Sequence, residues 1–299
     1  MAARVAERES QVVLGIDPDP SALWPGVAPA EDAGKLTPAR AAAVAVLEHC
    51  RRLIDAAGPA CVAIKPQLAR FELLGAPGRE ALGDVVEHAR SQGLLVIADG
   101  KRGDIDVTAG AYADSLFGGV ETPFGSVAGL GADMATVNPL MGRDAVAPFL
   151  RAARAQGGGV LLLVRTSNPG AADVEDLALA DGGTVWERVA GLVRELGGES
   201  VGPAGIADVG AVVGATVPGH LERARELMPS APFLLPGIGA QGGRVEELQS
   251  AFRPGRAGGL VSASRSIAGA HVAGGGSPEQ AARAEAERLR CAAWELSER

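Results

Sequence analysis

Carboxylates and an ammonium group lie close together in the segment ADGKRGDIDVTAGAYA at residues 98–113. Asp99 and Lys101 end the apolar run LLVIA at 94–98, which predicts a buried strand, and Asp104 follows. Side chains alternate along a strand, so Asp99 and Lys101 are expected on the same side. Because an uncompensated buried charge costs several kcal/mol, this spacing indicates electrostatic or proton-transfer chemistry. A solvated turn at a strand end is the alternative for the motif taken alone.

Two later segments have the composition of a phosphate site. The segment PGIGAQGG spans 236–243 and begins with Pro236, and SASRSI spans 262–267. Glycine lets backbone amides approach an anion, Gln241 can donate its side-chain amide, and Arg265 can hold two phosphate oxygens at once. Ordinary loops are the alternative interpretation of such glycine clusters.

Further polar residues end other apolar runs. Asp17 ends the first run, Lys65 the second, and Thr166 and Ser167 the fifth. The alternative is that each is an ordinary turn or surface residue without a functional role. Their joint occurrence at strand ends favours a shared site.

The elements that would position these residues alternate along the chain. Apolar, β-rich runs are followed by turn residues and then by amphipathic stretches, as in repeated βα units. Strands are predicted at 12–17, 61–67, 94–100, 134–139, 160–167, 209–216, 233–239 and 259–266. Helices are predicted at 37–57, 79–92, 106–116, 143–156, 184–196, 219–228, 244–252 and 278–295, with Thr37 and Ser277 as N-caps before proline.

Eight βα units predict a (β/α)8 TIM barrel, an α/β fold that typically takes about 250 residues. A doubly wound open sheet is the main rival. No linker divides the chain, so residues 1–299 are expected to form a single domain, with a long loop at 167–183. In such barrels the active site forms where the strands end, so the polar residues above should converge.

Composition narrows the class of partner. The chain has 299 residues, 47% of them hydrophobic, and a formal net charge of -8. This acidity, with one Tyr and six Phe, argues against nucleic acid as a partner. The charged N-terminus and the lack of an apolar run of about 20 residues argue against a membrane and favour a cytoplasmic location. Cys50, Cys61 and Cys291 are scattered, so neither a disulfide framework nor a structural zinc site is expected.

With these residues in view, the chain resembles the orotidine 5'-phosphate decarboxylase family from LGID at 14–17 to SRSI at 264–267. The resemblance is most specific at Asp-x-Lys-x-x-Asp in DGKRGDI, at PGIGAQGG and at the Arg265 segment. AIKPQ, VNPLMGRD and VRTSNPG suggest its bacterial branch with longer loops.

The resemblance implies decarboxylation of orotidine 5'-phosphate to uridine 5'-phosphate and CO2, the last step of de novo UMP synthesis, with no metal or organic cofactor. Lys65, Asp99, Lys101 and Asp104 would form an alternating charged tetrad, with Lys101 as the proton donor. Asp104 would reach into the site of the neighbouring subunit of a homodimer.

The same resemblance implies the substrate contacts. Asp17 would bind ribose hydroxyls, Ser167 would face the pyrimidine, and Thr108 would come from the partner subunit. Gln241 and Arg265, with the segment that begins at Pro236, would hold the phosphate. Ser264 departs from the glycine that the family often has before this arginine, and its side chain disfavours a positive φ.

Two other functions stay open. A related barrel acting on sugar phosphates shares Asp-x-Lys-x-x-Asp but holds Mg2+ through a glutamate near the end of the second strand, where this chain has Lys65. A catalytically silent protein that binds a phosphorylated ligand is the second alternative. The alternating lysines and aspartates argue against it, because phosphate binding alone gives them no use.

Overall fold

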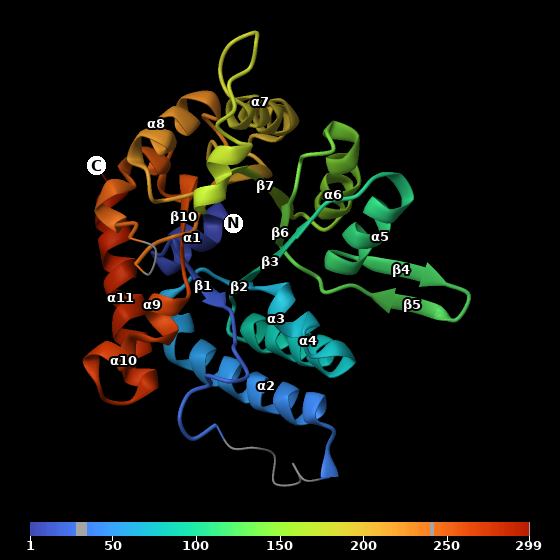
Figure 1. Ribbon diagram of the computed structural model, residues 1–299, viewed down its shortest axis with the longest axis vertical. Coiled ribbons are helices and arrows are strands. Elements are labelled where there is room, and N and C mark those ends of the chain that lie inside the picture. Colours follow the sequence, from blue (N-terminus) through green and yellow to red (C-terminus); the bar gives the residue numbers. More distant parts are fainter. Residues whose placement is uncertain (28–34, 240–241, 299) are drawn as a thin grey trace.

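The computed structural model in Figure 1 describes residues 1–27, 35–239 and 242–298 of the chain. Among these residues, eight parallel strands close into a barrel in the order β1-β10-β9-β8-β7-β6-β3-β2. They are β1 (Val12–Ile16), β2 (Ala63–Pro66), β3 (Leu95–Arg102), β6 (Met134–Val137), β7 (Gly159–Arg165), β8 (Val209–Val213), β9 (Phe233–Leu235) and β10 (Gly259–Ala263). Because β1 pairs with both β2 and β10, the predicted TIM barrel is confirmed and the open sheet is excluded.

Helices surround the barrel (Figure 1). The α-helices are α1 (Ala2–Arg8), α2 (Pro38–Ala57), α3 (Leu68–Glu72), α4 (Gly75–Ser91), α5 (Asp106–Leu116), α6 (Arg143–Ala155), α7 (Val185–Gly197), α8 (Pro218–Leu227), α9 (Arg265–Ala268), α10 (Ala270–Gly274) and α11 (Pro278–Leu296). Short 3-10 helices are η2 (Gly58–Ala60), η3 (Pro169–Asp173), η4 (Gly198–Ser200), η5 (Val245–Glu247), η6 (Gln249–Phe252) and η7 (Arg256–Gly258). Both predicted N-caps are observed. The Thr37 hydroxyl accepts from the backbone N–H of Arg40, and the Ser277 hydroxyl accepts from that of Gln280.

The alternation of strand side chains divides the core into two layers. Leu14, Val96 and Leu162 belong to the larger cluster, which the strands share with the surrounding helices. Val13 and Leu161 belong to the smaller cluster, which fills the barrel interior. Strands buried on both faces explain why the sequence shows continuous apolar runs.

Helix α1, which the sequence analysis did not predict, covers the amino-terminal end of the barrel. Its Val5 is buried in the barrel cluster. The guanidinium of Arg8 donates to the backbone carbonyls of Gly58 at 3.1 Å and Cys61 at 2.9 Å, and also to that of Gln92. These tertiary contacts stabilise a helix that is too short to form alone.

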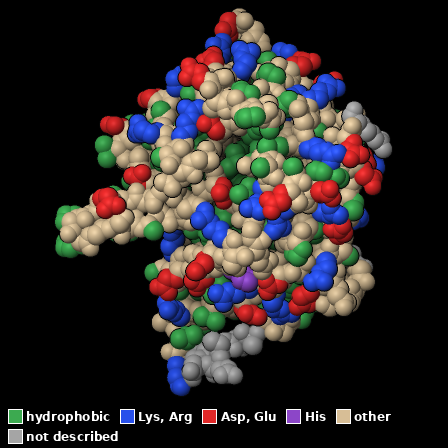
Figure 2. Space-filling model, turned by 180° about the vertical axis from the view of Figure 1, so that it is seen from behind, with side chains coloured by type: hydrophobic (Ala, Val, Ile, Leu, Met, Phe, Trp, Pro, Cys, Tyr) green, Lys and Arg blue, Asp and Glu red, His purple; other side chains and the backbone are tan. Residues whose placement is uncertain are grey.

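A second unpredicted element stands away from the barrel. The antiparallel hairpin of β4 (Gly119–Thr122) and β5 (Gly125–Ala128) joins α5 to β6 and projects outward in Figures 1 and 2. Phe124 at its tip is 99% exposed. The hairpin forms a separate sheet and adds no strand to the barrel.

The helix predicted at 244–252 is wrong. This segment forms the two 3-10 turns η5 and η6, closed by short bonds such as Leu248 N–H to Val245 O at 3.0 Å. The carbonyl of Ala251 accepts from the side chain of Arg225 instead of continuing a helix.

Among the described residues, no helix is both long and apolar enough to cross a membrane.

Candidate active site

A pocket of about 180 Å³ opens at the carboxyl ends of the barrel strands. Its apolar floor includes Val212 and Leu234 from the barrel interior. The charged and hydroxyl side chains around it come from different strands or strand ends: Asp17, Lys65, Asp99, Lys101, Thr136, Ser262, Ser264 and Arg265. The expected convergence of strand-end residues therefore occurs for part of the predicted set.

Asp99 lies at the centre of the charged side of this pocket. One carboxylate oxygen, Oδ2, accepts from Lys65 Nζ at 2.7 Å, and the other, Oδ1, accepts from Lys101 Nζ at 2.6 Å. Thr136 Oγ1 donates to Oδ1 at 2.9 Å, and the amide of Gln67 donates to Oδ2 at 3.3 Å. The carboxylate is thus fully engaged.

Two opposing effects set the ionisation of Asp99. Burial by itself raises the pKa of this carboxyl, but the charges and hydrogen bonds of Lys65 and Lys101 outweigh burial and lower the pKa to about 2. Asp99 is therefore an anion at neutral pH. Its anionic form stabilises the two ammonium groups next to the pocket.

The two lysines differ in their access to the pocket. The Lys65 side chain is only 8% exposed, whereas that of Lys101 is 44% exposed. Lys65 is therefore placed to hold Asp99, and Lys101 can also reach a molecule in the pocket.

The backbone at Lys101 departs from a regular strand. Its φ is +49°, and the pairing of β3 with β6 shifts register between Ala98 and Arg102. A non-glycine residue in this left-handed region costs about 1 kcal/mol, here compensated by a bond from Lys101 N–H to Thr136 Oγ1 at 2.9 Å. Asp99 and Lys101 do meet, but a bulge rather than simple alternation brings them together.

The opposite wall of the pocket carries the predicted phosphate residues. Pro236 and Gly237 follow β9, and Arg265 begins α9 after β10. Arg265 is exposed, so its guanidinium is accessible to an anion. Gln241 lies outside the described residues.

Ser264 fits beside the pocket because β1 contains a glycine. Its φ is -123°, so it needs no left-handed backbone. A Cβ on Gly15 would lie 2.5 Å from the Cβ of Ser264, which is a severe overlap. Gly15 therefore makes room for the side chain of Ser264.

Three predicted site residues do not line this pocket. Asp104 is half-buried, and its Oδ1 accepts from the backbone N–H of Ile105 at 2.8 Å. Thr108 is exposed on α5, and Ser167 follows β7, half-buried in the loop. Within one subunit, the structure does not place these three residues among those that line the pocket with Lys101.

Thr136 and Gln67 are site residues that the sequence analysis missed. Thr136 lies within β6, where threonine is an ordinary strand former. Its position in an otherwise apolar buried run, MATV, is the available signal. Gln67 is the last residue of the strand predicted at 61–67; it directly follows β2 and faces Asp99 through an isolated parallel bridge.

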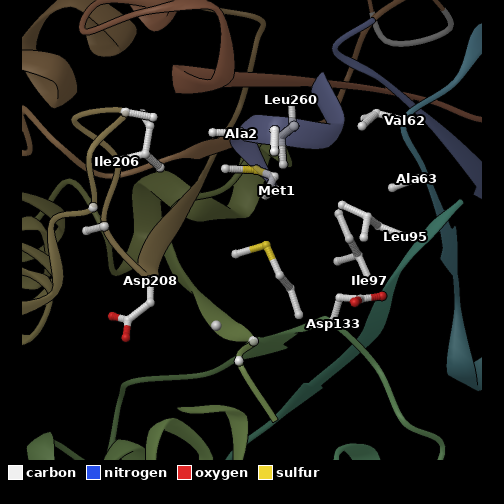
Figure 3. Close-up of a pocket in the computed structure, with 18 of the residues that line it drawn as sticks. Met1, Ala2, Val62, Ala63, Leu95, Ile97, Asp133, Ile206, Asp208 and Leu260 are labelled. Atoms are coloured by element: carbon white, nitrogen blue, oxygen red, sulfur yellow. The ribbon is translucent and has the colours of Figure 1, made fainter. Parts of the chain in front are cut away.

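A larger cavity, of about 460 Å³, lies at the opposite end of the barrel. Figure 3 shows its apolar walls, among them Leu95, Ile97 and Leu260, with Asp133 and Asp208 at the edge. Both carboxylates are engaged, Asp133 by the backbone N–H of Val96 and Asp208 by Arg154. The smaller, charged pocket is the better candidate for chemistry despite its size.

No described residues form a group of three or more His, Cys, Asp or Glu side chains arranged to hold a metal ion. Asp99, one of the two carboxylates that line the pocket, accepts from ammonium groups on both of its oxygens. A bound cation would have to displace at least one of them.

A closed barrel with charged side chains at its carboxyl end defines the class of (β/α)8 barrel enzymes. The model of the Orotidine 5'-phosphate decarboxylase / HUMPS family matches residues 10–284. The chain therefore belongs to this family.

Relatives with known names agree. The chain is 43% identical over 232 residues to the orotidine 5'-phosphate decarboxylase of Rhodopirellula baltica, covering 77% of this chain and 74% of the relative. It is 44% identical over 238 residues to that of Deinococcus radiodurans, covering 79% and 82%. The structure of Leishmania donovani OMP decarboxylase is similar with a TM-score of 0.71 at 31% identity, covering 98% of each chain. The long-loop bacterial branch stays a prediction.

Proposed function

We propose that this chain decarboxylates orotidine 5'-phosphate to uridine 5'-phosphate in pyrimidine biosynthesis, without a metal or organic cofactor. Family membership supports the reaction. The observation that carries the residue assignment is Asp99 held between two lysine ammonium groups, with Arg265 on the opposite wall of the same pocket. That arrangement provides a reactive end and an anion-binding end.

The reaction requires stabilisation of negative charge. When the bond between C6 and the carboxylate breaks, CO2 leaves and the electron pair stays on C6 of the pyrimidine. Lys101 stabilises this carbanion with its ammonium charge and then transfers a proton from Nζ to C6. Solvent returns a proton to Lys101, so one proton is consumed for each CO2 released.

Asp99, Lys65 and Thr136 prepare Lys101 for this step. Asp99 holds the ammonium at 2.6 Å, Lys65 offsets the carboxylate charge, and Thr136 fixes both the Asp99 side chain and the Lys101 backbone. These bonds exist before substrate arrives, so little reorganisation is needed during the reaction.

The remaining predicted residues bind substrate in this proposal. Arg265 and Gln241 hold the phosphate beside Pro236, and Asp17 binds ribose hydroxyls. Asp17 supports this role because its Oδ1 is buried without a hydrogen-bond partner and the residue lines the pocket. Ser167 contacts the pyrimidine when the loop that follows β7 approaches the ring.

We also propose that the enzyme is a homodimer with shared sites. Asp104 and Thr108 do not line the pocket of their own subunit, and the nearby Ile105 and Val107 are exposed apolar side chains. A second copy covering this surface would bury these side chains and receive Asp104 in its own site. Mixing Lys101→Ala and Asp104→Ala subunits tests this, because one restored site in each hybrid should give partial activity. No recovery after proven subunit exchange would contradict sharing.

The sugar-phosphate reaction of related barrels is the alternative. It requires Mg2+, and here the ammonium of Lys65 stands where a metal-binding glutamate is expected. We propose a cytoplasmic location, which the free thiols of Cys50 and Cys61 support and cell fractionation would test.

The direct test follows the ultraviolet absorbance of orotidine 5'-phosphate with purified protein in EDTA. Conversion to uridine 5'-phosphate is expected at the same rate with and without the chelator. Loss of activity in EDTA, restored by Mg2+, would favour the sugar-phosphate class of site. Binding of uridine 5'-phosphate without any turnover would favour a protein that only binds.

A further inference from the structure

Trp24 connects the loop that follows β1 to the short helix that begins with Arg265. Its indole Nε1–H donates to the backbone carbonyl of Ala268 at 2.7 Å, and the residue is only 4% exposed. Ala268 is the last residue of α9, and Arg265 is the first. A single side chain from the β1 loop therefore anchors the helix that carries the proposed phosphate ligand.

The backbone of Trp24 is fixed as well. Its N–H donates to Nδ1 of His49, a buried residue on α2, at 3.2 Å. Burial, with the nearby Arg52 and His271, lowers the pKa of His49 to about 4. The imidazole is therefore neutral at neutral pH and can accept this bond.

Aromatic and cationic neighbours hold the indole ring in one orientation. The rings of His49 and His271 pack edge-on at centroid distances of 5.2 and 6.3 Å, and the Arg52 guanidinium lies 5.9 Å from the ring. Arg52 also pairs with Glu279 on α11. The indole therefore contacts side chains of α2 and α10 and the backbone of α9, and Arg52 connects this cluster to α11.

An outside anchor matters because α9 has only four residues. A helix of that length has little internal hydrogen bonding and cannot fix its own direction. Arg265 is exposed and lines the pocket, and the rest of α9 is held by the buried side chain of Ile267 and by contacts at Ala268. The β1 loop that begins at Asp17 supplies one such contact.

We propose that Trp24 is a positioning residue for the phosphate site, which holds α9 through Ala268 so that Arg265 faces the pocket. This inference rests on the proposed function, because it takes Arg265 to bind the phosphate of a nucleotide. It predicts that Trp24 affects the affinity for a phosphorylated ligand and leaves the affinity for the nucleoside unchanged.

Trp24→Phe tests this by removing the N–H while keeping a buried aromatic ring. Binding of uridine 5'-phosphate should weaken about 3- to 10-fold, as expected for one lost hydrogen bond, while uridine binding is unchanged. The KM for orotidine 5'-phosphate should rise by a similar factor with kcat changed less than 2-fold. Trp186→Phe is the matched control, because Trp186 is 5% exposed on α7 and lies away from the pocket.

The Arg265→Ala background makes the test specific. If Trp24 acts through Arg265, adding Trp24→Phe to Arg265→Ala should weaken nucleotide binding no further. Equal weakening of nucleotide and nucleoside, unchanged nucleotide binding in Trp24→Phe, or full additivity with Arg265→Ala would each overturn the inference. A wild-type protein that binds no uridine 5'-phosphate would instead contradict the proposed function.

A measurement on the wild-type chain decides the case if Trp24→Phe does not fold. The sequence has three Trp, so 15N labelling gives three indole N–H signals, which Trp186→Phe and Trp294→Phe assign by elimination. Saturating uridine 5'-phosphate should shift the Trp24 signal, and uridine should not. An unmoved signal with bound nucleotide would overturn the inference.

Discussion

The two ends of the barrel hold cationic side chains in different ways. At the carboxyl end, Lys65 and Lys101 pair with one carboxylate beside an open pocket. At the amino end, the guanidinium of Arg225 donates to five backbone carbonyls, those of Met228, Pro229, Ala231, Ala251 and Gly258. The first arrangement leaves an ammonium accessible to a ligand, and the second leaves the cation enclosed.

We expect Arg225 at the amino end to contribute to stability, and the lysines at the carboxyl end to contribute to function. Burial lowers the pKa of Arg225 to about 9, and its guanidinium lies 3.8 Å from the Phe233 ring centre. Its bonds tie together the segments that precede β9 and β10. A cation shared among neutral carbonyls stabilises the chain, whereas a cation beside an anion and a pocket can respond to a change of charge in that pocket.

The largest expected effect is on catalysis at the carboxyl end. Lys101→Ala should lower kcat by at least about 10³-fold, because it removes both charge stabilisation and the proton donor. Uridine 5'-phosphate binding and the melting temperature should stay near wild-type values. Absorbance assays, calorimetry and thermal unfolding measure the three quantities. Near-normal turnover would remove Lys101 from its proposed role.

At the amino end, Arg225→Met should act on stability. Losing the guanidinium leaves several buried carbonyls without donors, so the free energy of unfolding should fall by about 3 kcal/mol or more while kcat is retained in the folded fraction. Urea unfolding measures the loss. Arg188→Met is the control, because Arg188 pairs with Asp181 on the exposed surface and should change stability little. If Arg225→Met lost activity while its free energy of unfolding stayed at the wild-type value, the two ends would not differ in the way we describe.

A smaller effect is expected from acid, which should lower the contribution of Asp99 at the carboxyl end to the free energy of unfolding. Asp99 has a pKa of about 2 in the folded chain against an ordinary 3.8, so it stabilises the fold fully above about pH 4. That contribution, on the order of 2 kcal/mol, is lost as the pH falls from about 4 to 2. Urea unfolding between pH 5 and 3 should therefore show a steeper loss in wild type than in Asp99→Asn. Parallel curves would show that Asp99 is not held in its charged form.

The smallest effect is expected in the apolar cavity of Figure 3. Ala2→Leu adds apolar atoms to its α1 wall and should raise the free energy of unfolding by about 1 kcal/mol or less, with no change in kcat. Thermal unfolding and the absorbance assay check both. A marked change in kcat would show that the amino end communicates with the charged pocket.

The repeat pattern predicted the barrel because its strands are continuous apolar runs. The N-caps of α2 and α11 were predictable from Thr37 and Ser277, each followed by proline, because a local side-chain hydrogen bond sets the start of the helix. Helix α1 was missed because Arg8 and Val5 stabilise it through distant segments. The prediction of a helix at 244–252 was also wrong because of a contact between distant segments, in which the Arg225 side chain donates a hydrogen bond to the carbonyl of Ala251.

The site was predictable where chemistry demands an unusual residue. Lys65, Asp99 and Lys101 stand out at the ends of apolar runs, and the structure brings them together. Thr136 does not stand out, because its role depends on the bulge at Lys101. Asp104 and Thr108 do not line the pocket, and the role that we propose for them needs a second subunit, which the pattern of one chain does not specify.

Closure of the barrel has a consequence for synthesis of the chain. Strand β1 pairs with β10, so Val12 meets Val261 only after nearly the whole chain exists. The pocket that joins Asp17 to Arg265 across this seam cannot form on a shorter nascent chain. A nascent chain that lacks β10 therefore carries the charged residues of β2 and β3 without Arg265, and the pocket is completed only when most of the chain has been synthesised.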